Sequence, residues 1–195
     1  YRDPEYPEFV ETYSEDVRTM WDMLEKSVED FGPLPCFGTR PKKADGSFGD
    51  YEWISFRQFY DRVEKFASAL HAIGLVDREF VAICSVNRLE WPIAQYSCYR
   101  QNLIPVPLYD TLGKEGLEHI CRETEFALCV CSAATLPSMI ALKEATQTAR
   151  FQYLICMDEQ LDPALREKAK EAGLKLYTMS EAEALVTELA EPRLP

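Results

Sequence analysis

The stretch that decides the fold runs from Ile104 to Gly113 and reads Ile-Pro-Val-Pro-Leu-Tyr-Asp-Thr-Leu-Gly. Its apolar first half predicts a β-strand, and its polar second half predicts a loop that leads into a helix. In an open α/β sheet, ligands bind beyond the carboxyl ends of the strands, where the following helices present free backbone N–H groups. The stretch therefore predicts where a ligand binds, but not which ligand.

The same switch between strand and helix recurs along the chain. Short apolar runs predict strands at residues 51–54, 80–84, 104–109, 127–131, 153–157 and 174–177. Apolar residues at helical spacing predict helices from residue 16 to the Gly-Pro at 32–33, and at 56–73, 90–99, 114–121, 136–145, 163–172 and 180–189. This alternation predicts an α/β fold with a mainly parallel sheet and helices on both faces.

Local signals predict several boundaries. Ser55 is expected to cap the helix that follows it, and Gly74 to take the left-handed position after that helix. Asn87 is expected to cap the next helix, and Ser180 with Glu183 to form a capping box at the last one. An Asp-Gly turn at 41–50 predicts a hairpin.

Composition excludes some classes of function. The chain has 195 residues, 47% of them hydrophobic, and a net charge of −12. The length predicts one domain with a substantial core. The acidic balance argues against a nucleic-acid groove and against a polybasic membrane-docking surface. No apolar run approaches the roughly 20 residues of a membrane span, and the first residues do not resemble a signal peptide. The missing initiator Met suggests processing or trimming, which leaves room for a removed targeting or anchoring segment.

The seven cysteines lie mostly in apolar runs and contain no Cys-x-x-Cys. This pattern favours reduced core thiols in a cytosolic or nuclear-type compartment over a disulfide framework. Cys129 and Cys131 are expected to share one strand face, where two thiolates can bind a metal ion, but no second ligand pair stands at a suitable spacing, which favours the core interpretation. An independent thiol enzyme using Cys98 or Cys129 is the third hypothesis for function.

Familiar catalytic motifs are missing from the sequence, including the glycine-rich phosphate loops, Gly-x-Ser-x-Gly and His-Glu-x-x-His. His71 and His119 are interpreted as helical residues without a catalytic partner. Asp110 and Thr111 fit N-capping of the helix after the strand, and they also fit the lining of a ligand site. No catalytic residue and no metal ligand is predicted.

Polar and aromatic residues around two of the predicted helix starts have a structural interpretation. Glu90 suits the first turn of its helix, and Trp91 is expected to fill the core. Packing, rather than stacking on a nucleic acid, is expected for five aromatic residues: Tyr51, Trp53, Phe56, Phe59 and Tyr60.

Three strings carry a resemblance to a known family. They are Tyr51-Glu52-Trp53-Ile54-Ser55-Phe56, Ser85-Val86-Asn87-Arg88-Leu89-Glu90-Trp91 and Val106-Pro107-Leu108-Tyr109-Asp110-Thr111-Leu112-Gly113. In this order and approximate spacing, they resemble the eukaryotic-type long-chain acyl-CoA synthetases of the adenylate-forming superfamily. The resemblance extends from about Val17 to the end. It implies the N-terminal subdomain of an acetyl-CoA-synthetase-like enzyme.

The resemblance implies a two-step ligase that uses a long-chain fatty acid, ATP with Mg, and CoA. The family's phosphate loop, adenine motif, ribose-binding Asp and catalytic Lys lie downstream of this region, so the chain alone is expected to be inactive and to bind none of these tightly. In related synthetases, the loop corresponding to Leu108–Gly113 lies near the CoA nucleotide. By that analogy, the candidates for a CoA-proximal surface are Tyr109, Asp110, Thr111 and Gly113.

The expected domain plan has three parts. Residues 1–15 form an extended arm, residues 16–190 the N-terminal α/β subdomain of the AMP-binding large domain, and residues 191–195 a linker toward the missing phosphate loop. The expected location is the cytoplasm or the surface of an intracellular membrane such as the endoplasmic reticulum. The alternative function is a non-catalytic α/β ligand-binding or interaction module that shares the fold.

Overall fold

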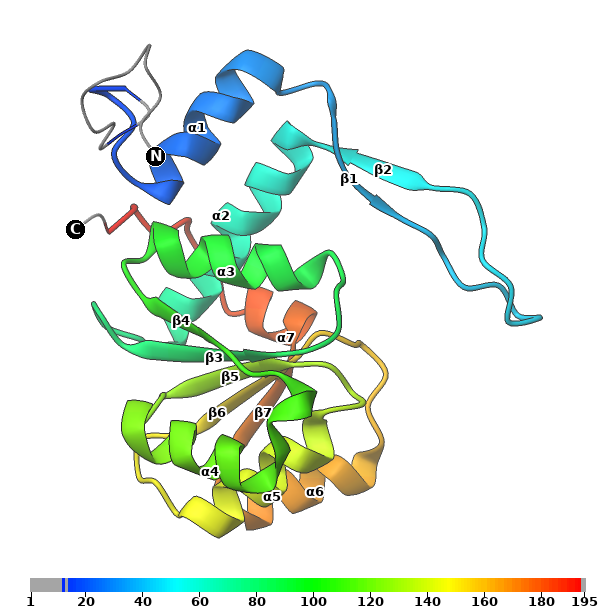
Figure 1. The fold of residues 1–195 in the computed structure, drawn as a ribbon, viewed down its shortest axis with the longest axis vertical. Coiled ribbons are helices and arrows are strands. Elements are labelled where there is room, and N and C mark those ends of the chain that lie inside the picture. Colours follow the sequence, from blue (N-terminus) through cyan, green and yellow to red (C-terminus); the bar gives the residue numbers. More distant parts are fainter. Residues whose placement is uncertain (1–11, 13, 194–195) are drawn as a thin grey trace, which may run out of the picture.

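The computed structural model describes residues 12 and 14–193, and most of the arm predicted at residues 1–15 lies outside this range. Figure 1 shows helices packed on two faces of one sheet, with a hairpin projecting to the side. The elements are α1 Met20–Phe31, β1 Pro35–Thr39, β2 Glu52–Ser55, α2 Phe56–Ile73, β3 Phe80–Cys84, α3 Glu90–Arg100, β4 Ile104–Pro107, the 3-10 helix η1 Asp110–Leu112, α4 Gly113–Thr124, β5 Leu128–Cys131, α5 Leu136–Thr146, β6 Tyr153–Cys156, α6 Pro163–Glu171, β7 Lys175–Thr178 and α7 Met179–Glu183.

Five parallel strands form the main sheet, in the order β4-β3-β5-β6-β7. Helices α2, α3 and α7 cover one face, with α1 packed on the outside of α2 and α3, and α4, α5 and α6 cover the other face (Figure 1). The predicted α/β class is therefore confirmed. From β3 the chain moves to β4 on one side and then to β5 on the other, so the strand order reverses between β3 and β5. Such a reversal is where open α/β sheets place their ligands.

Burial on both faces explains why the central strands are continuously apolar. Val81 and Ile83 pack in the core under α2 and α3, whereas Ala82 and Cys84 pack in the core under α4 and α5. All four are at most 3% exposed. Successive side chains of the strand therefore point alternately into two separate cores, one on each face of the sheet.

Strand β4 is an edge strand and is shorter than predicted, ending at Pro107. The backbone N–H groups of Ile104 and Leu108 donate to the carbonyls of Glu79 and Ile83 at 2.9 and 2.8 Å, which anchors both ends of β4 on β3. Beyond Leu108 the chain leaves the sheet.

The predicted hairpin is confirmed as an antiparallel pair, β1 with β2. Its inner side chains, Phe37 and Ile54, pack on the core that contains α2. The hairpin turn lies away from the helices (Figure 1).

Helix α2 has the predicted ends. Ser55 Oγ accepts the Gln58 N–H at 3.2 Å, the Gln58 side chain accepts the Ser55 N–H at 2.8 Å, and Gly74 has φ 101°. Helix α1 begins four residues later than predicted, because Thr19 forms a capping box with Asp22.

The capping box predicted at Ser180 and Glu183 is wrong. Thr178 caps α7, with Glu181 as its partner, and the helix ends at Glu183 rather than Leu189. An equivalent box pattern begins two residues earlier, at the last residue of β7, so the helix starts as soon as the strand ends.

The segment after α7 returns to the helical layer. Arg100, which is 4% exposed, donates from Nη1 to the Ala190 carbonyl at 2.5 Å and from Nη2 to Glu64 Oε1 at 2.9 Å. The Arg193 N–H donates to the Arg100 carbonyl at 2.8 Å. Among the described residues, no helix is long and apolar enough to cross a membrane.

Candidate functional site

A hollow of about 630 Å³ opens at the carboxyl edge of the sheet, between the loops that follow β3 and β4. It is lined by Ser85, Val86, Asn87, Trp91, Pro107, Leu108 and Tyr109. A narrow recess of about 50 Å³ continues from Tyr109 to Cys84 and Thr135, at the point where the strand order reverses between β3 and β5. The structure therefore brings the predicted loop to the edge where a ligand was expected.

The four predicted site residues fall in a compact turn. Tyr109 is 63% exposed and precedes η1, Thr111 is exposed, and Gly113 begins α4 with φ 68° and ψ 170°. Asp110 starts η1, and its side chain lies outside the described part of the structure. Only glycine adopts the Gly113 backbone conformation without strain, which explains this residue type.

Leu112 occupies the N-cap position of α4, so the N-cap position predicted for Asp110 or Thr111 is wrong. The intervening 3-10 turn, closed by the Leu112 N–H on the Tyr109 carbonyl at 3.2 Å, moves the helix start downstream. This displacement leaves the Thr111 side chain at the surface.

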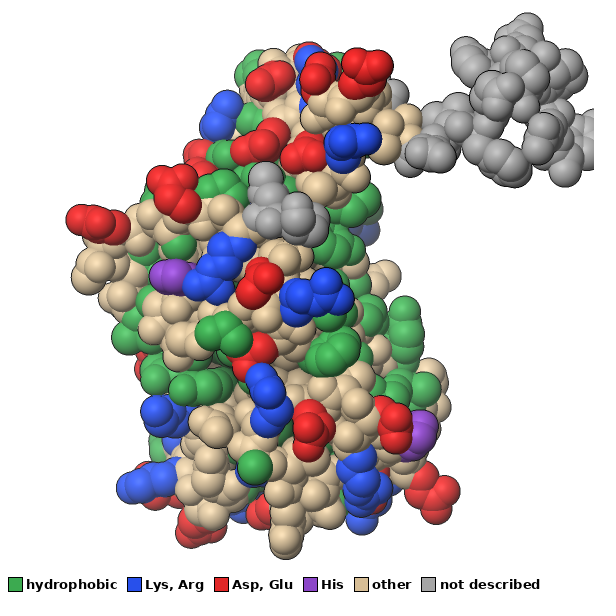
Figure 2. Space-filling model, turned by 90° about the vertical axis from the view of Figure 1, so that its left-hand side faces the viewer, with side chains coloured by type: hydrophobic (Ala, Val, Ile, Leu, Met, Phe, Trp, Pro, Cys, Tyr) green, Lys and Arg blue, Asp and Glu red, His purple; other side chains and the backbone are tan. Residues whose placement is uncertain are grey.

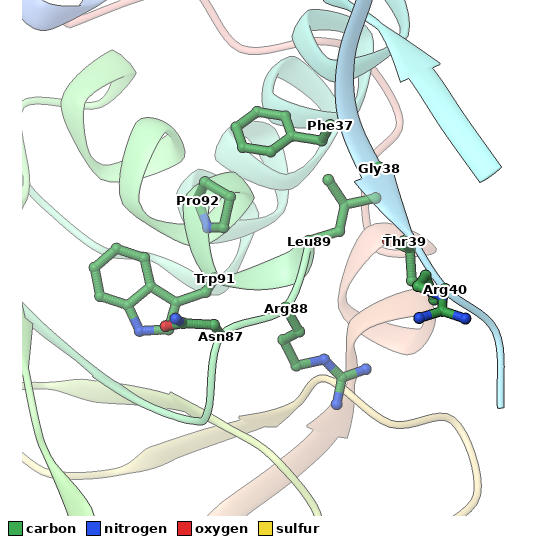
Figure 3. A pocket seen from close by; sticks show the side chains of 9 residues that line it. All are labelled: Phe37, Gly38, Thr39, Arg40, Asn87, Arg88, Leu89, Trp91 and Pro92. Atoms are coloured by element: carbon green, nitrogen blue, oxygen red, sulfur yellow. The ribbon is translucent and has the colours of Figure 1, made fainter. Parts of the chain in front are cut away.

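A second hollow, of about 460 Å³, separates the hairpin from the loop after β3 (Figure 3). Asn87 and Trp91 border both hollows. The cap predicted at Asn87 is wrong, because Leu89 is the N-cap of α3 and Asn87 is exposed. Trp91 is half-buried and packs against the core, as predicted, although one side borders the hollows. The start of α3 is instead held by the ion pairs of Arg88.

Arg88 joins three loops at this edge. Its Nε donates to Glu90 at 2.7 Å, its Nη1 donates to Asp158 at 2.9 Å, and its Nη2 donates to the Met157 carbonyl at 3.4 Å. The other Asp158 oxygen accepts the Ala133 N–H at 2.8 Å. The loops after β3, β5 and β6 are thereby fixed relative to one another.

The electrostatics of this network follow from its partners. Burial opposes ionisation of Asp158, but the Ala133 N–H and the Arg88 guanidinium together hold the pKa of that carboxyl below its usual value. Burial likewise opposes the charge on Arg88, yet Glu90 and Asp158 raise its pKa. Both groups are therefore charged at neutral pH.

Sequence reasoning missed the pairing of Arg88 with Asp158. A usable signal was present, since both residues follow a buried strand closely, after Cys84 and Cys156 respectively. The carboxyl ends of parallel strands lie along one edge of the sheet, and Arg88 and Asp158 reach each other across the end of β5, which lies between β3 and β6.

A third hollow, of about 300 Å³, lies between α4 and α5 beside the predicted loop. It is lined by Gly113, Lys114, Leu117, Glu118, Ser138, Ala141 and Leu142. The Lys114 side chain is 81% exposed and forms an ion pair with Glu118, with 3.8 Å between Nζ and Oε1. This hollow therefore combines apolar side chains with an ion pair in the first turns of α4.

The thiols are structural. Six of the seven cysteines are buried, and Cys36 is half-buried. Burial raises the pKa of Cys98 and of Cys129, which disfavours the thiolate that a nucleophile requires. His71 and His119 are exposed on α2 and α4, as the sequence predicted. Within the described residues, no group of three or more His, Cys, Asp or Glu side chains could hold a metal ion.

A family model described as "AMP-binding enzyme" matches residues 37–193. The chain belongs to the AMP-binding enzyme family. The match includes the hairpin, the main sheet and the loop at Tyr109. It confirms the predicted membership of the adenylate-forming superfamily.

Several curated relatives of this AMP-binding chain are acyl-CoA synthetases. Fatty acyl-CoA synthetase B of Dictyostelium discoideum is 35% identical over 167 residues, which cover 86% of this chain and 24% of the relative. Long-chain-fatty-acid–CoA ligase 5 of Rattus norvegicus is 29% identical over 186 residues, covering 94% of this chain and 26% of the relative. The predicted resemblance is confirmed, and the chain spans about a quarter of the length of these relatives.

Solved structures show the same fold at low identity. The adenylation domain of a carboxylate reductase from Mycobacterium chelonae superimposes with a TM-score of 0.79 at 20% identity, covering 94% of this chain and 31% of that chain. The adenylation and carrier didomain of a carboxylic acid reductase from Segniliparus rugosus gives a TM-score of 0.75 at 22% identity, covering 91% and 28%. The AMP-binding chain therefore has the fold of about a third of an adenylation domain.

Proposed function

We propose that this chain is the N-terminal part of a long-chain fatty acid–CoA ligase. One observation carries the proposal: the loop from Tyr109 to Gly113, which bears the most specific family string, lies at the carboxyl edge of the sheet, where open α/β sheets bind their ligands. The long-chain ligases among the curated relatives support the substrate class. Residues 16–190 would form the first α/β subdomain of the AMP-binding large domain, and residues 191–195 would lead toward the phosphate loop.

In such a ligase, a fatty acid carboxylate oxygen attacks the α-phosphorus of ATP, and pyrophosphate leaves. The CoA thiol then attacks the acyl carbonyl, and AMP leaves. Mg²⁺ would neutralise phosphate charge in the first step. The resemblance assigns the groups that hold ATP and Mg²⁺ to residues outside this chain, so we propose that the chain alone is inactive.

The contribution proposed for this chain is to the path of CoA. The exposed Tyr109 ring and the Thr111 hydroxyl offer an apolar face and a hydrogen-bonding group, and Gly113 allows the backbone to turn into α4. Beside them, the exposed Lys114 would offer a cation to a phosphate in place of Glu118, its ion-pair partner at 3.8 Å, next to the hollow lined by Leu117. CoA, a nucleotide that carries phosphates and a long arm of methylene and amide groups, fits this combination. The Asp110 backbone belongs to the same turn.

We propose that the ligase acts in the cytoplasm or on the surface of an intracellular membrane such as the endoplasmic reticulum. Acyl-CoA is amphipathic, and the fatty acid substrate partitions into bilayers. Both the substrate and the product are therefore accessible at either location.

The test uses the intact longer protein with palmitate, and measures pyrophosphate release and acyl-CoA formation separately. The proposal expects both activities in the longer protein and neither in residues 1–195. Tyr109→Ala in the longer protein is expected to raise the KM for CoA by roughly tenfold, which corresponds to the loss of one aromatic contact, and to leave pyrophosphate release unchanged. Val76→Ser, at an exposed site in the loop between α2 and β3, is the matched control.

Two results would count against the proposal. A folded longer protein that adenylates only amino acids or aryl acids would remove the long-chain assignment. A natural stop codon directly after Pro195 would favour the alternative, a non-catalytic α/β ligand-binding or interaction module, which the missing phosphate loop motivates.

A further inference from the structure

The loop after β3, which spans residues 85–89, forms one wall of the hollow at the carboxyl edge of the sheet. Ser85, Val86 and Asn87 line that hollow together with Tyr109. Within the described part of the chain, no backbone N–H or carbonyl of residues 85–89 bonds to another loop or to a strand. The hydrogen bonds that tie this loop to other loops all come from the Arg88 side chain.

Core packing fixes only the far end of this loop. Leu89 packs against the core, whereas Val86 is 68% exposed and Asn87 is also exposed. An exposed loop without backbone hydrogen bonds opens locally at little cost in free energy. The position of the wall at residues 85–87 therefore depends on what holds the next residue, Arg88.

Arg88 acts on the hollow from behind its wall. It does not itself line the hollow of about 630 Å³, whereas Asn87 and Trp91 do. Figure 3 shows the Arg88 guanidinium pointing away from these two side chains. Its bonds go instead to the first turn of α3 and to the loop after β6. Arg88 can therefore affect a ligand in the hollow only through the residues that it holds in place.

Asp158 extends the same constraint to a second wall. One of its oxygens accepts from Arg88 Nη1 at 2.9 Å, and the other accepts the Ala133 N–H at 2.8 Å. Ala133 belongs to the loop after β5, in which Thr135 Oγ1 donates to the Cys84 carbonyl at 2.8 Å. The narrow recess of about 50 Å³ is lined by Cys84, Ser85, Val86, Tyr109 and Thr135. The pair of Arg88 and Asp158 thus links the loops that form two of its walls.

The recess is narrow enough for small displacements of these walls to matter. One water molecule needs about 10–15 Å³ of such space, so 50 Å³ accommodates only a few atoms of a ligand. In enzymes, a shift of about 1 Å in the groups that hold a substrate costs up to roughly a hundredfold in rate. An anchor that ties both loops therefore controls the fit of whatever enters the recess.

We propose that Arg88 is a positioning residue for the CoA-dependent step. It holds the 85–87 wall and the Thr135 side of the recess at the spacing that the arm of CoA requires beside Tyr109. This role rests on the proposed function, in which the hollow is part of the CoA path. Arginine suits it because a rigid guanidinium fork bonds several acceptors in fixed directions, which the single ammonium of lysine does not reproduce.

The chain offers a matched control at the opposite edge of the sheet. Arg150 precedes β6 and pairs with Glu79, which precedes β3, and their side chains are 54% and 14% exposed. Side chains of both charges are interspersed on the face in Figure 2, so exposed ion pairs are ordinary on this protein. Loss of the Arg150 pair therefore removes a similar interaction without touching the hollow.

The test measures steady-state kinetics of the intact longer protein with palmitate. Arg88→Gln is expected to raise the KM for CoA by roughly three- to tenfold, with pyrophosphate release unchanged. Asp158→Asn should raise this KM similarly, and the double variant should raise it no further, because both changes break one link. Arg88→Lys should restore part of the affinity, and Arg150→Gln should leave the KM at the wild-type value.

A second readout uses the 195-residue chain and needs no activity. In nuclear magnetic resonance, the Ala133 amide should exchange its hydrogen faster in Arg88→Gln than in wild type, because its acceptor Asp158 loses an anchor. Unchanged exchange would disprove the link between the two loops. Near-ultraviolet circular dichroism checks folding, and Arg88→Lys with Asp158→Asn carries the test if Arg88→Gln does not fold.

The kinetic outcomes separate this role from the ligase proposal. A longer protein that forms no acyl-CoA overturns both. An active ligase in which Arg88→Gln leaves the KM for CoA unchanged overturns the positioning role alone. The same holds if Arg150→Gln raises that KM equally, or if Arg88→Gln lowers pyrophosphate release in parallel, because either result indicates a general loss of structure.

Discussion

Arg88 and Asp158, 70 positions apart in the sequence, meet through a hydrogen-bonded ion pair of 2.9 Å between Nη1 and Oδ1. Because Asp158 also accepts the Ala133 N–H, one carboxylate links the ends of β3, β5 and β6. The pair is partly exposed, at 26% and 36% of the two side chains, so its contribution to stability is smaller than that of a buried pair.

Replacing one member of this pair should loosen the edge of the sheet. Arg88→Gln is expected to lower the free energy of unfolding by about 1–2 kcal/mol, after allowance for exposure, because two carboxylates lose their partner. Combined with Asp158→Asn in a double-mutant cycle in urea, the two changes should cost less than their sum. Strict additivity would show that the pair contributes no coupling energy.

The pKa of Asp158, which lies below its usual value, makes this stabilisation dependent on pH. A depressed carboxyl pKa stabilises the folded state above the unfolded-state pKa, about 4, and the effect disappears as the pH falls through the folded-state value. The difference in unfolding free energy between wild type and Asp158→Asn should therefore be largest near pH 7 and should shrink as the pH falls through the folded-state pKa of Asp158.

Urea titrations at several pH values measure that difference. Asp22 and Glu159 also have lowered pKa values, so wild type and variant alike should lose further stability in acid. A difference that stays constant down to the lowest pH would contradict an ionised Asp158.

Two glycines near the candidate site should respond in opposite directions to alanine. Gly113 combines φ 68° with ψ 170°, a conformation nearly restricted to glycine, so Gly113→Ala is expected to cost about 1–3 kcal/mol. Gly116 lies inside α4, where an added Cβ meets only Leu112 Cβ at 3.4 Å. Gly116→Ala should therefore stabilise the protein by up to about 1 kcal/mol. Thermal unfolding of both variants and of wild type measures these changes in stability. A change of the same sign in both variants would contradict the backbone conformations described for Gly113 and Gly116.

Thiol labelling tests the structural role of the cysteines. Brief treatment of the folded chain with iodoacetamide should modify Cys36 slowly and leave the six buried cysteines intact, while all seven react after unfolding. Mass spectrometry counts the modified sites. Fast labelling of Cys98 or Cys129 in the folded chain would revive the hypothesis of an independent thiol enzyme.

Helices and strands whose sequence signals lie within a few residues of one another were predicted correctly. The apolar runs at β3, β5 and β6, and the ends of α2 at Ser55 and Gly74, are fixed by burial on both faces and by local backbone geometry. The position of the ligand edge also followed, because it depends only on where strands end.

Features that depend on competition or on distant partners were not predicted. Thr178 with Glu181 and Ser180 with Glu183 have the same capping-box spacing. Thr178 is the cap because β7 ends at that residue, which the local pattern does not reveal. The exposure of Trp53 depends on the hairpin leaving the helical body, which no local pattern records. Neither the strand order nor the approach of Arg88 to Asp158 has a signature within one window of sequence.

The two prolines of β4 have a consequence for how this sheet can grow. The N–H groups of Ile104 and Leu108 point toward β3, so alternation turns the nitrogen atoms of Pro105 and Pro107 toward the open edge, where they have no hydrogen to donate. No strand can form a regular ladder on that side. Pro105 and Pro107, which precede the Tyr109 loop, therefore protect the β4 edge of the sheet from aggregation by strand pairing. A further strand can join the sheet only at its other edge, beside β7.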